Sequence, residues 1–292
     1  MKKKTKAMIL NLFALFVMGG LLLTFSSCSD DPTQTEDLSS TEVISATELK
    51  YSDETEMISE EVSTIAEDLY AADEIASLSK GYYHSDYLPE CVTVTVVITD
   101  TTKDVTLDFG EGCELHNGNT LSGIIHISYA LDLEAASNTI ELTLENFTFN
   151  DVAVEGASSI VRVRSNENGN PQGTANASFT ATWPNGDVAS FTGTRTREWI
   201  EGFGTGFWGD NVFLITGKRT YVSRAGNEFI KEITTPLRRE MSCRFIVSGV
   251  LDITRLGNTV SLDFGDGSCD AFGTLTYSDG TQEEIFLRRF KN

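Results

Sequence analysis

Val105-Thr106-Leu107-Asp108-Phe109-Gly110-Glu111-Gly112-Cys113 is the segment around which this chain is organised, because its pattern occurs twice. The second copy is Val260-Ser261-Leu262-Asp263-Phe264-Gly265-Asp266-Gly267-Ser268-Cys269. Each copy alternates apolar and polar residues and then enters an acidic, glycine-rich segment that stops at a cysteine. This pattern predicts a β-strand followed by a tight turn. We therefore expect two related β units, at residues 91–129 and 243–290.

An upstream cysteine accompanies each copy, which gives Cys91 with Cys113 and Cys243 with Cys269. Four cysteines allow three disulfide pairings, and the repeat favours pairing within each unit. Each disulfide would close a loop of about 22–26 residues and restrict the unfolded chain by about 3 kcal/mol. The close-spaced cysteine pairs of a structural zinc site are absent. Disulfides are typical of exported proteins, so the cysteines indicate an oxidising compartment.

The segment 82–292 predicts one β domain. About fourteen short stretches have the two-residue periodicity of strands, and turn sequences separate them. A change of parity near Asn146 predicts a β-bulge. No helical periodicity follows residue 81, and strands without crossover helices pair in antiparallel fashion. Because so many strands must split into layers or curl, we expect a mainly β fold, either a large antiparallel sandwich or a curved, barrel-like sheet.

Residues 51–81 predict one N-terminal amphipathic helix, regular from 53 to 79, capped by Ser52 or Asp53 and ended by Gly81. Its apolar residues recur at helical spacing, and acidic residues lie between them. The stripe consists of Ile58, Val62, Ile65, Leu69, Ala72 and Ile75. We expect the acidic face to be solvated and the stripe to pack on the β domain or on a partner.

The first 27 residues have the organisation of an export signal, with a basic start, an apolar stretch from Met8 to Phe25 and small residues before Cys28. They resemble the lipoprotein signal peptides of bacteria. The resemblance implies that Cys28 becomes the acylated first residue, with palmitate among its lipids. Residues 28–50 are rich in Ser, Thr, Asp and Glu, which predicts a disordered acidic tether.

The segment 82–292 also resembles an uncharacterised family of secreted lipoproteins of Bacteroidota. The resemblance implies export and a β-rich fold, and it implies no activity. The motifs that carry it are Cys91-Val92-Thr93-Val94, Leu107-Asp108-Phe109-Gly110 with Cys113, Glu145-Asn146-Phe147-Thr148-Phe149-Asn150, Asp210-Asn211-Val212 with Thr216-Gly217, and Cys243 with Leu262-Asp263-Phe264-Gly265 and Cys269-Asp270.

The chain has 292 residues and a formal net charge of −21. A protein this acidic is repelled by nucleic acid and by anionic lipid headgroups, which excludes both as main partners. We expect membrane attachment only through the lipid anchor. No motif indicates a cofactor.

One stretch rich in arginine and aromatic residues is the best candidate for a ligand surface. Glycines separate several of its aromatic residues, which predicts a loop that could present flat rings to a ligand, although large rings more often form the core. The candidate residues are Arg195, Arg197, Trp199, Phe203, Phe207 and Trp208. A calcium site at Asp263, Asp266 and Asp270 is less favoured than a plain acidic turn.

Catalytic motifs are absent from the sequence, which holds three histidines and neither a nucleophile elbow nor a zinc-binding helix motif. We therefore expect a binding protein rather than an enzyme. It would be lipid-anchored in the outer membrane of a Gram-negative bacterium and bind a glycan or a protein at the cell surface. One alternative is a structural envelope component that docks a partner through the helix. The other is a hydrolase that uses carboxylates such as Asp187 with Glu198 or Glu201.

Overall fold

The computed structural model describes residues 43–79 and 85–287, and within them one helix is associated with fourteen strands. The helix α1 spans Ala46–Ser79, and a short 3-10 helix spans Trp208–Asp210. The strands are β1 (Thr93–Ile98), β2 (Thr102–Asp108), β3 (Cys113–Glu114), β4 (Thr120–Ala130), β5 (Ser137–Phe149), β6 (Val152–Val163), β7 (Gln172–Thr182), β8 (Val188–Glu201), β9 (Val212–Val222), β10 (Glu228–Glu240), β11 (Ile246–Arg255), β12 (Asn258–Asp266), β13 (Phe272–Thr276) and β14 (Gln282–Phe286).

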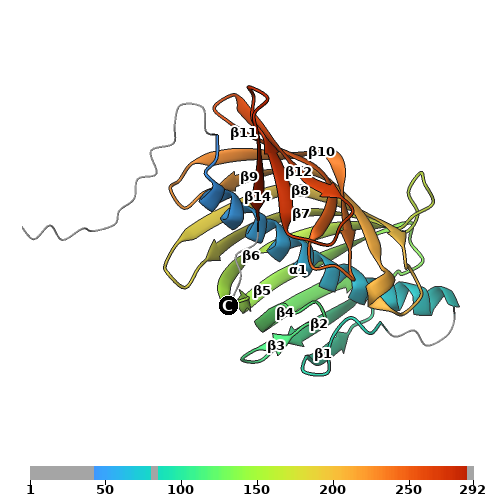
Figure 1. The fold of residues 1–292 in the computed structure, drawn as a ribbon. Helices are drawn as coiled ribbons and strands as arrows, with labels where there is room; N and C mark the ends of the chain where they lie inside the picture. The colour runs from blue at the N-terminus through green and yellow to red at the C-terminus, as the bar shows by residue number, and fades with distance from the viewer. Residues whose placement is uncertain (1–42, 80–84, 288–292) are drawn as a thin grey trace, which may run out of the picture. The chain divides into compact units, whose positions relative to one another are not determined.

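All fourteen strands belong to one antiparallel sheet, in which strands follow one another almost in sequence order from β1 to β14. The short strand β3 lies off this path and pairs with β4. The sheet is not closed, so β1 and β14 are its two edges. The expectation of a mainly β, antiparallel fold is confirmed, and the observed form is a single curved sheet (Figure 1).

Glycines inside the strands explain why the sheet can bend. Gly156 has φ 136°, and a Cβ added there would lie 2.1 Å from the carbonyl oxygen of Ser178 on β7. Four further strand glycines combine a positive φ with a similarly close approach of backbone. Positive φ and contact this close are tolerated only by glycine, and such kinks bend a sheet. The four are Gly123, Gly193, Gly217 and Gly249.

A register shift between β5 and β6 adds to the bending. The pairing of the two strands is interrupted between Thr143 and Phe147, and Asn146 within the interruption has φ 49°. A local extra residue increases strand twist and redirects the chain. The bulge predicted near Asn146 is confirmed.

Helix α1 lies along the concave side of the sheet (Figure 1). It begins at residue 46, earlier than the predicted residue 51, because Ser45 rather than Ser52 or Asp53 caps it. The Ser45 hydroxyl accepts a hydrogen bond from the backbone N–H of Glu48 at 3.1 Å, which is the hydrogen bond of a serine N-cap. Val43 and Ile44 are buried, so the predicted tether 28–50 ends before residue 43. Gly81 lies outside the described residues.

The apolar stripe of α1 packs into the core, as its spacing indicated. Ile58, Val62 and Ile65 are fully buried against the sheet. The expectation that the acidic face is solvated is wrong, because glutamates on several sides of the helix are also buried. The helix therefore belongs to the interior of the unit that it forms with the sheet.

Both predicted disulfides are present, Cys91–Cys113 and Cys243–Cys269. The two units lie at opposite edges of the sheet, since the first supplies β1 to β4 and the second supplies β11 to β14. The repeated turn has the same geometry in both. Asp108 accepts a hydrogen bond from the N–H of Gly110 at 2.8 Å, and Asp263 accepts one from Gly265 at 2.9 Å.

Candidate functional site: an ionic seam under the helix and a groove beside it

The predicted ligand surface does not exist as an exposed patch. In β8 the side chains alternate between the two faces of the sheet, and Arg195, Arg197 and Trp199 are on the buried face, with exposures of 1%, 1% and 3%. Phe203 and Trp208 are partly buried, while Phe207 is 56% exposed. The prediction is therefore wrong for Arg195, Arg197 and Trp199, because strand parity turns them toward the helix, and the alternative that these residues belong to the core holds for them.

Trp208 and its loop serve a structural role. The Trp208 ring stacks on His116, with ring centroids 5.5 Å apart and an interplanar angle of 12°. Its backbone N–H donates a hydrogen bond to Asp86 at 2.8 Å. These contacts fasten the loop after β8 to the segment that follows α1 and to the turn before β4.

Carboxylates of α1 meet cations of the sheet along the length of the helix, and most of these groups are buried. We call this set the ionic seam. Its carboxylates come from a single helix, and its cations come from β6, β8, β9 and β10 and from the residues just after β6 and β9. The members are Glu48, Glu56, Glu60, Glu67 and Glu74, with Arg162, Arg164, Arg195, Arg197, Arg219, Arg224 and Lys231.

Glu56 is the centre of the seam, because three cations converge on it. Its carboxylate oxygens lie 2.9 Å from Arg195, 3.2 Å from Arg219 and 3.0 Å from Lys231. Burial alone would raise the pKa of Glu56, but the charges of Arg195, Lys231 and Arg219 hold it well below its usual range. Burial also lowers the pKa of Lys231 and brings that of Arg219 to about 10. The cluster is thus an interdependent set of charges.

Glu67 occupies a cradle formed by three neighbouring strands. Arg162 of β6, Gly173 of β7 and Arg197 of β8 are consecutive cross-strand partners. A Cβ added at Gly173 would lie 2.4 Å from a Glu67 oxygen, so the glycine makes room for the carboxylate between the two arginines. Burial raises the pKa of Glu67 and outweighs the opposing charges of Arg197 and Arg162.

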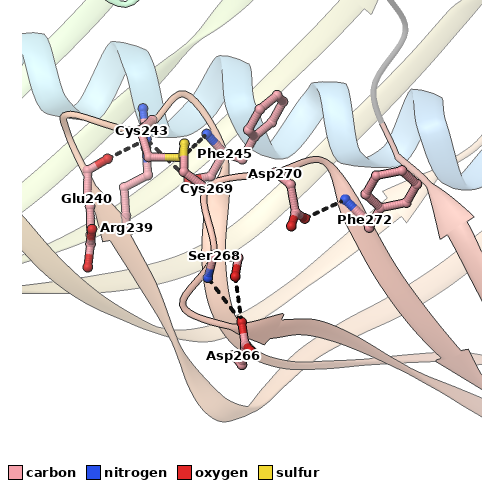
Figure 2. Close-up of a disulfide and its surroundings, with 9 residues drawn as sticks. All are labelled: Arg239, Glu240, Cys243, Phe245, Asp266, Ser268, Cys269, Asp270 and Phe272. Atoms are coloured by element: carbon pink, nitrogen blue, oxygen red, sulfur yellow. Dashed lines mark hydrogen bonds between the residues drawn. A yellow bond between two sulfur atoms is a disulfide. The ribbon is translucent and has the colours of Figure 1, made fainter.

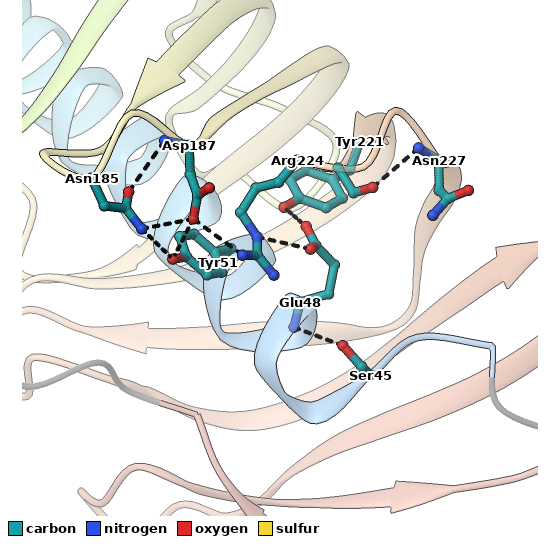
Figure 3. A network of polar contacts seen from close by, with 9 residues as sticks. Ser45, Glu48, Tyr51, Asn185, Asp187, Tyr221, Arg224 and Asn227 are labelled. Atoms are coloured by element: carbon teal, nitrogen blue, oxygen red, sulfur yellow. Dashed lines mark hydrogen bonds and ion pairs between the residues drawn. The ribbon is translucent and has the colours of Figure 1, made fainter. Parts of the chain in front are cut away.

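The two ends of the seam are also fixed by charged contacts. Glu74 lies 3.2 Å from Arg162 and 3.3 Å from Arg164. Toward the start of the helix, Glu48 accepts a hydrogen bond from Arg224 at 3.0 Å and another from the Tyr221 hydroxyl (Figure 3).

Asp187 extends this network to the turn between β7 and β8. Its carboxylate accepts hydrogen bonds from Tyr51 and Asn185, both at 2.8 Å, and from Arg224 at 3.1 Å (Figure 3). These hydrogen bonds lower the pKa of Asp187 despite the opposing effect of desolvation. A carboxylate held in this way acts as a structural anchor.

Asp68 is a buried carboxylate of α1 outside the seam. Burial raises its pKa to about 6, the nearby charge of Asp86 adds to the rise, and a hydrogen bond from Ser85 opposes it. No ion pair involves Asp68 within the described residues. It therefore costs the folded state free energy when it ionises.

A groove of about 480 Å³ lies beside the first turns of α1, and we call it the rim groove. The β5–β6 turn, the β7–β8 turn, the start of β4 and the segment before β11 complete its wall. Its size falls within the range of small-molecule sites. It is lined by Lys50, Asp53, Glu54, Met57, Gly118, Thr120, Phe149, Asn150, Asp151, Val152, Trp183, Pro184, Asn185 and Arg244.

The floor of the rim groove is aromatic and buried, and its wall is polar. Phe149 and Trp183 are buried, and the Trp183 indole N–H donates a hydrogen bond to Glu54 at 2.8 Å. Asn150 and Asp151 have φ values of 49° and 67°, which is uncommon for residues with side chains. They are the two central residues of the hairpin turn between β5 and β6, where asparagine and aspartate commonly adopt positive φ. The Asn150 side chain accepts a hydrogen bond from the Thr120 N–H at 2.8 Å and donates one to Asn119 at 3.1 Å, which fixes it at this turn.

Arg244 gives the rim groove a cation with no carboxylate partner among residues 43–79 and 85–287. Its guanidinium lies near Gly118, where an added Cβ would be 3.9 Å away. Every arginine of the ionic seam, by contrast, pairs with a glutamate. The Arg244 guanidinium could therefore donate hydrogen bonds to an oxygen of a ligand.

The carboxylate pairs considered for hydrolysis are not brought together. Asp187 precedes β8, whereas Glu198 and Glu201 lie near its far end, roughly 30 Å or more away at about 3.3 Å per residue. Glu198 accepts hydrogen bonds from Asn168 at 2.9 Å and Asn170 at 2.8 Å, and Glu201 pairs with Arg238 at 3.0 Å. These separations are far too large for a glycosidase pair.

The candidate calcium site is not assembled either. Asp266 accepts hydrogen bonds from the backbone and hydroxyl of Ser268, and Asp270 accepts one from Phe272 (Figure 2). Like Asp263, each carboxylate stabilises its own turn. In the part of the chain that the structure describes, no three metal-binding side chains come together.

Sequence reasoning missed both the ionic seam and the rim groove. A signal for the seam was present, because Arg195 and Arg197 have the same strand parity as the buried Phe191. No comparable signal marked the groove, since two turns, the start of β4, the segment before β11 and the helix together form its walls. Only the turn sequence Pro184-Asn185 pointed to a loop there.

No helix in the described residues is long and apolar enough to cross a membrane. No family model matches the chain, and neither the curated proteins nor the solved structures include a significant match.

Proposed function

We propose that the protein is an exported, lipid-anchored binding protein whose rim groove holds a sugar unit of a glycan. The observation that carries the proposal is the groove itself. It combines a buried aromatic floor with amide, carboxylate and cationic side chains at Asn185, Asp151, Lys50 and Arg244. Sugars carry many hydroxyl groups in fixed directions, and closely spaced donors and acceptors of this kind recognise them. A groove of this size favours a small polar ligand over a flat protein surface.

The proposed anchor rests on the sequence of residues 1–31. Acylation of Cys28 would attach the fold to the outer membrane and place the groove at the cell surface. A mass spectrum of the protein from native membranes tests this. We expect an acylated Cys28 at the amino terminus, and an unmodified Cys28 would contradict the anchor without bearing on the groove.

Binding at the groove is tested by screening the purified protein on a glycan array and measuring affinities by calorimetry. Asp151→Asn removes a charge while keeping a residue type that tolerates positive φ. Arg244→Gln removes the cation. Each change should weaken binding about tenfold, because a hydrogen bond to a charged group contributes about 1.5–3 kcal/mol.

A matched control is Asp132→Asn, an exposed carboxylate on a loop that does not line the groove. It should leave the affinity unchanged. If a bound glycan keeps its affinity in both groove variants, the site lies elsewhere. If no glycan binds the folded wild-type protein, the assigned ligand class is wrong.

A further inference from the structure

Strand β1, at one edge of the sheet, lacks the features that normally protect an edge. All six of its residues, Thr93-Val94-Thr95-Val96-Val97-Ile98, are exposed. Its only neighbour within the described residues is β2, and the pairing runs without a bulge. It contains no charge, proline or glycine. Natural proteins usually blunt edges with such residues, because a bare edge offers unpaired backbone groups to another strand.

The uncovered side chains of β1 lie on the core face of the sheet. Val94 pairs across the strands with Leu107, and Val96 pairs with Val105. Directly opposed residues share a face, and both β2 residues are fully buried. Yet Val96 is 44% and Ile98 is 63% exposed. The apolar core face of the sheet thus extends beyond the part that α1 covers. It ends at three exposed branched side chains, those of Val94, Val96 and Ile98.

We propose that β1 pairs with β1 of a second copy of this chain. A two-fold axis perpendicular to the sheet brings the strands together in antiparallel orientation and keeps each face on the same side. Residues of equal parity must then be opposed, and among such registers the one centred on Val96 opposes all three uncovered residues. It sets Val96 against its own counterpart and Val94 against the partner's Ile98. The three uncovered apolar residues of each copy then form one continuous stripe.

The distribution of charge favours pairing through β1 over other contacts between two copies. The chain carries a net charge of −21, so most surfaces of two copies repel each other. β1 is uncharged, and the register places Asp100 opposite the partner's Val92. The other edge, β14, exposes Glu283 and Glu284, which would oppose like charges in a β14 pair. A contact of β1 with β14 would not close, whereas the two-fold pair does.

The test uses the full chain in nonionic detergent. Sedimentation equilibrium should give a protein mass of two copies for the wild type and of one copy for Val96→Lys, which places a charge against its own counterpart. Val161→Lys is the control, since Val161 is equally exposed at 46% but lies in the interior strand β6. It should leave the mass at two copies.

A second variant keeps the proposal testable if Val96→Lys fails to fold. Val96→Cys is a small change, and opposed residues in this register are close enough to form a disulfide. On mild oxidation it should cross-link to twice the chain mass at least tenfold faster than Val161→Cys. A monomeric wild type, equal cross-linking of the two variants, or cross-linking of Val96→Cys only to a different protein would each overturn the proposal.

Discussion

A side chain at Gly173 would disturb the ionic seam, because an added Cβ would lie 2.4 Å from an oxygen of Glu67. Neither oxygen of Glu67 accepts a hydrogen bond in the described part of the chain. The carboxylate is held instead by Arg197 at 3.5 Å and by the space that Gly173 leaves. Residue identity at one strand position thus sets where a helix carboxylate can be buried.

Asp68 provides a prediction at the residue scale. Its pKa is 3.8 in the unfolded chain and about 6 in the fold. The folded state therefore holds this proton more tightly, and the stability that it contributes below pH 3.8 is lost as the pH rises toward 6. Above pH 6 the folded protein carries the full cost of the buried charge.

Asp68→Asn should consequently increase the free energy of unfolding at pH 7.5, by on the order of 2 kcal/mol. The gain should shrink toward zero near pH 4, where Asp68 is protonated in the fold. Urea unfolding of both chains at the two pH values measures this. Asp104→Asn, an exposed carboxylate on β2, should show no such pH-dependent gain. A destabilised Asp68→Asn at pH 7.5 would refute the assignment.

Among the elements, the helix shows which features the sequence predicts and which it does not. The spacing of Ile58, Val62 and Ile65 identified the helix and its core-facing stripe. The start at residue 46 was also readable, because a serine three residues before a glutamate is typical of a helix start. Burial of the acidic face was not readable from the helix alone. Its partners, such as Arg162 for Glu74, are 88 residues away along the chain.

Strand parity could have supplied part of the missing information. Arginines at core-facing positions of β8 require buried anions, and among the described residues α1 supplies the carboxylates that pair with them. The rim groove could not be inferred in this way, because its position depends on how the β5–β6 and β7–β8 turns meet the helix. Such long-range geometry follows from the curvature of the sheet, which a sequence pattern does not specify.

A prediction at the element scale concerns Glu56. Glu56→Gln would leave Arg195, Arg219 and Lys231 buried around a neutral group. Removing one partner of a buried ion pair typically costs about 3–5 kcal/mol, so we expect a loss of this size in chemical denaturation at pH 7. Combining it with Lys231→Met should recover part of the loss, since one uncompensated cation is then removed.

Glu155→Gln serves as the matched control for Glu56, because Glu155 is exposed on β6. We expect its effect to stay within about 0.5 kcal/mol. An equal effect of the Glu56 and Glu155 variants would mean that the seam adds no net stability. No recovery in the Glu56 and Lys231 double variant would show that the three cations are not coupled through Glu56.

At the scale of the whole molecule, the helix and the concave face of the sheet are complementary in charge. Kinked glycines such as Gly156 bend the strands, and the resulting concave face is lined with arginines as well as apolar groups. A purely apolar helix would leave those cations unpaired. The acidic composition of residues 46–79, which as a sequence suggested a solvated surface, is instead complementary to the interior.

A variant lacking residues 46–79 should therefore fail to fold, because the cations of the ionic seam would lose their carboxylates and the core would lose Ile58, Val62 and Ile65. We expect no cooperative transition in thermal unfolding followed by circular dichroism. A variant lacking residues 29–42 is the control and should unfold at the wild-type temperature. Addition of a peptide with residues 43–79 should restore a cooperative transition to the deleted chain.

If the chain without the helix unfolds cooperatively at the wild-type temperature, the helix is an accessory to an independent sheet. The ionic seam would then be an interface at which the helix can separate from the sheet. The concave face of the sheet would become available to other acidic ligands.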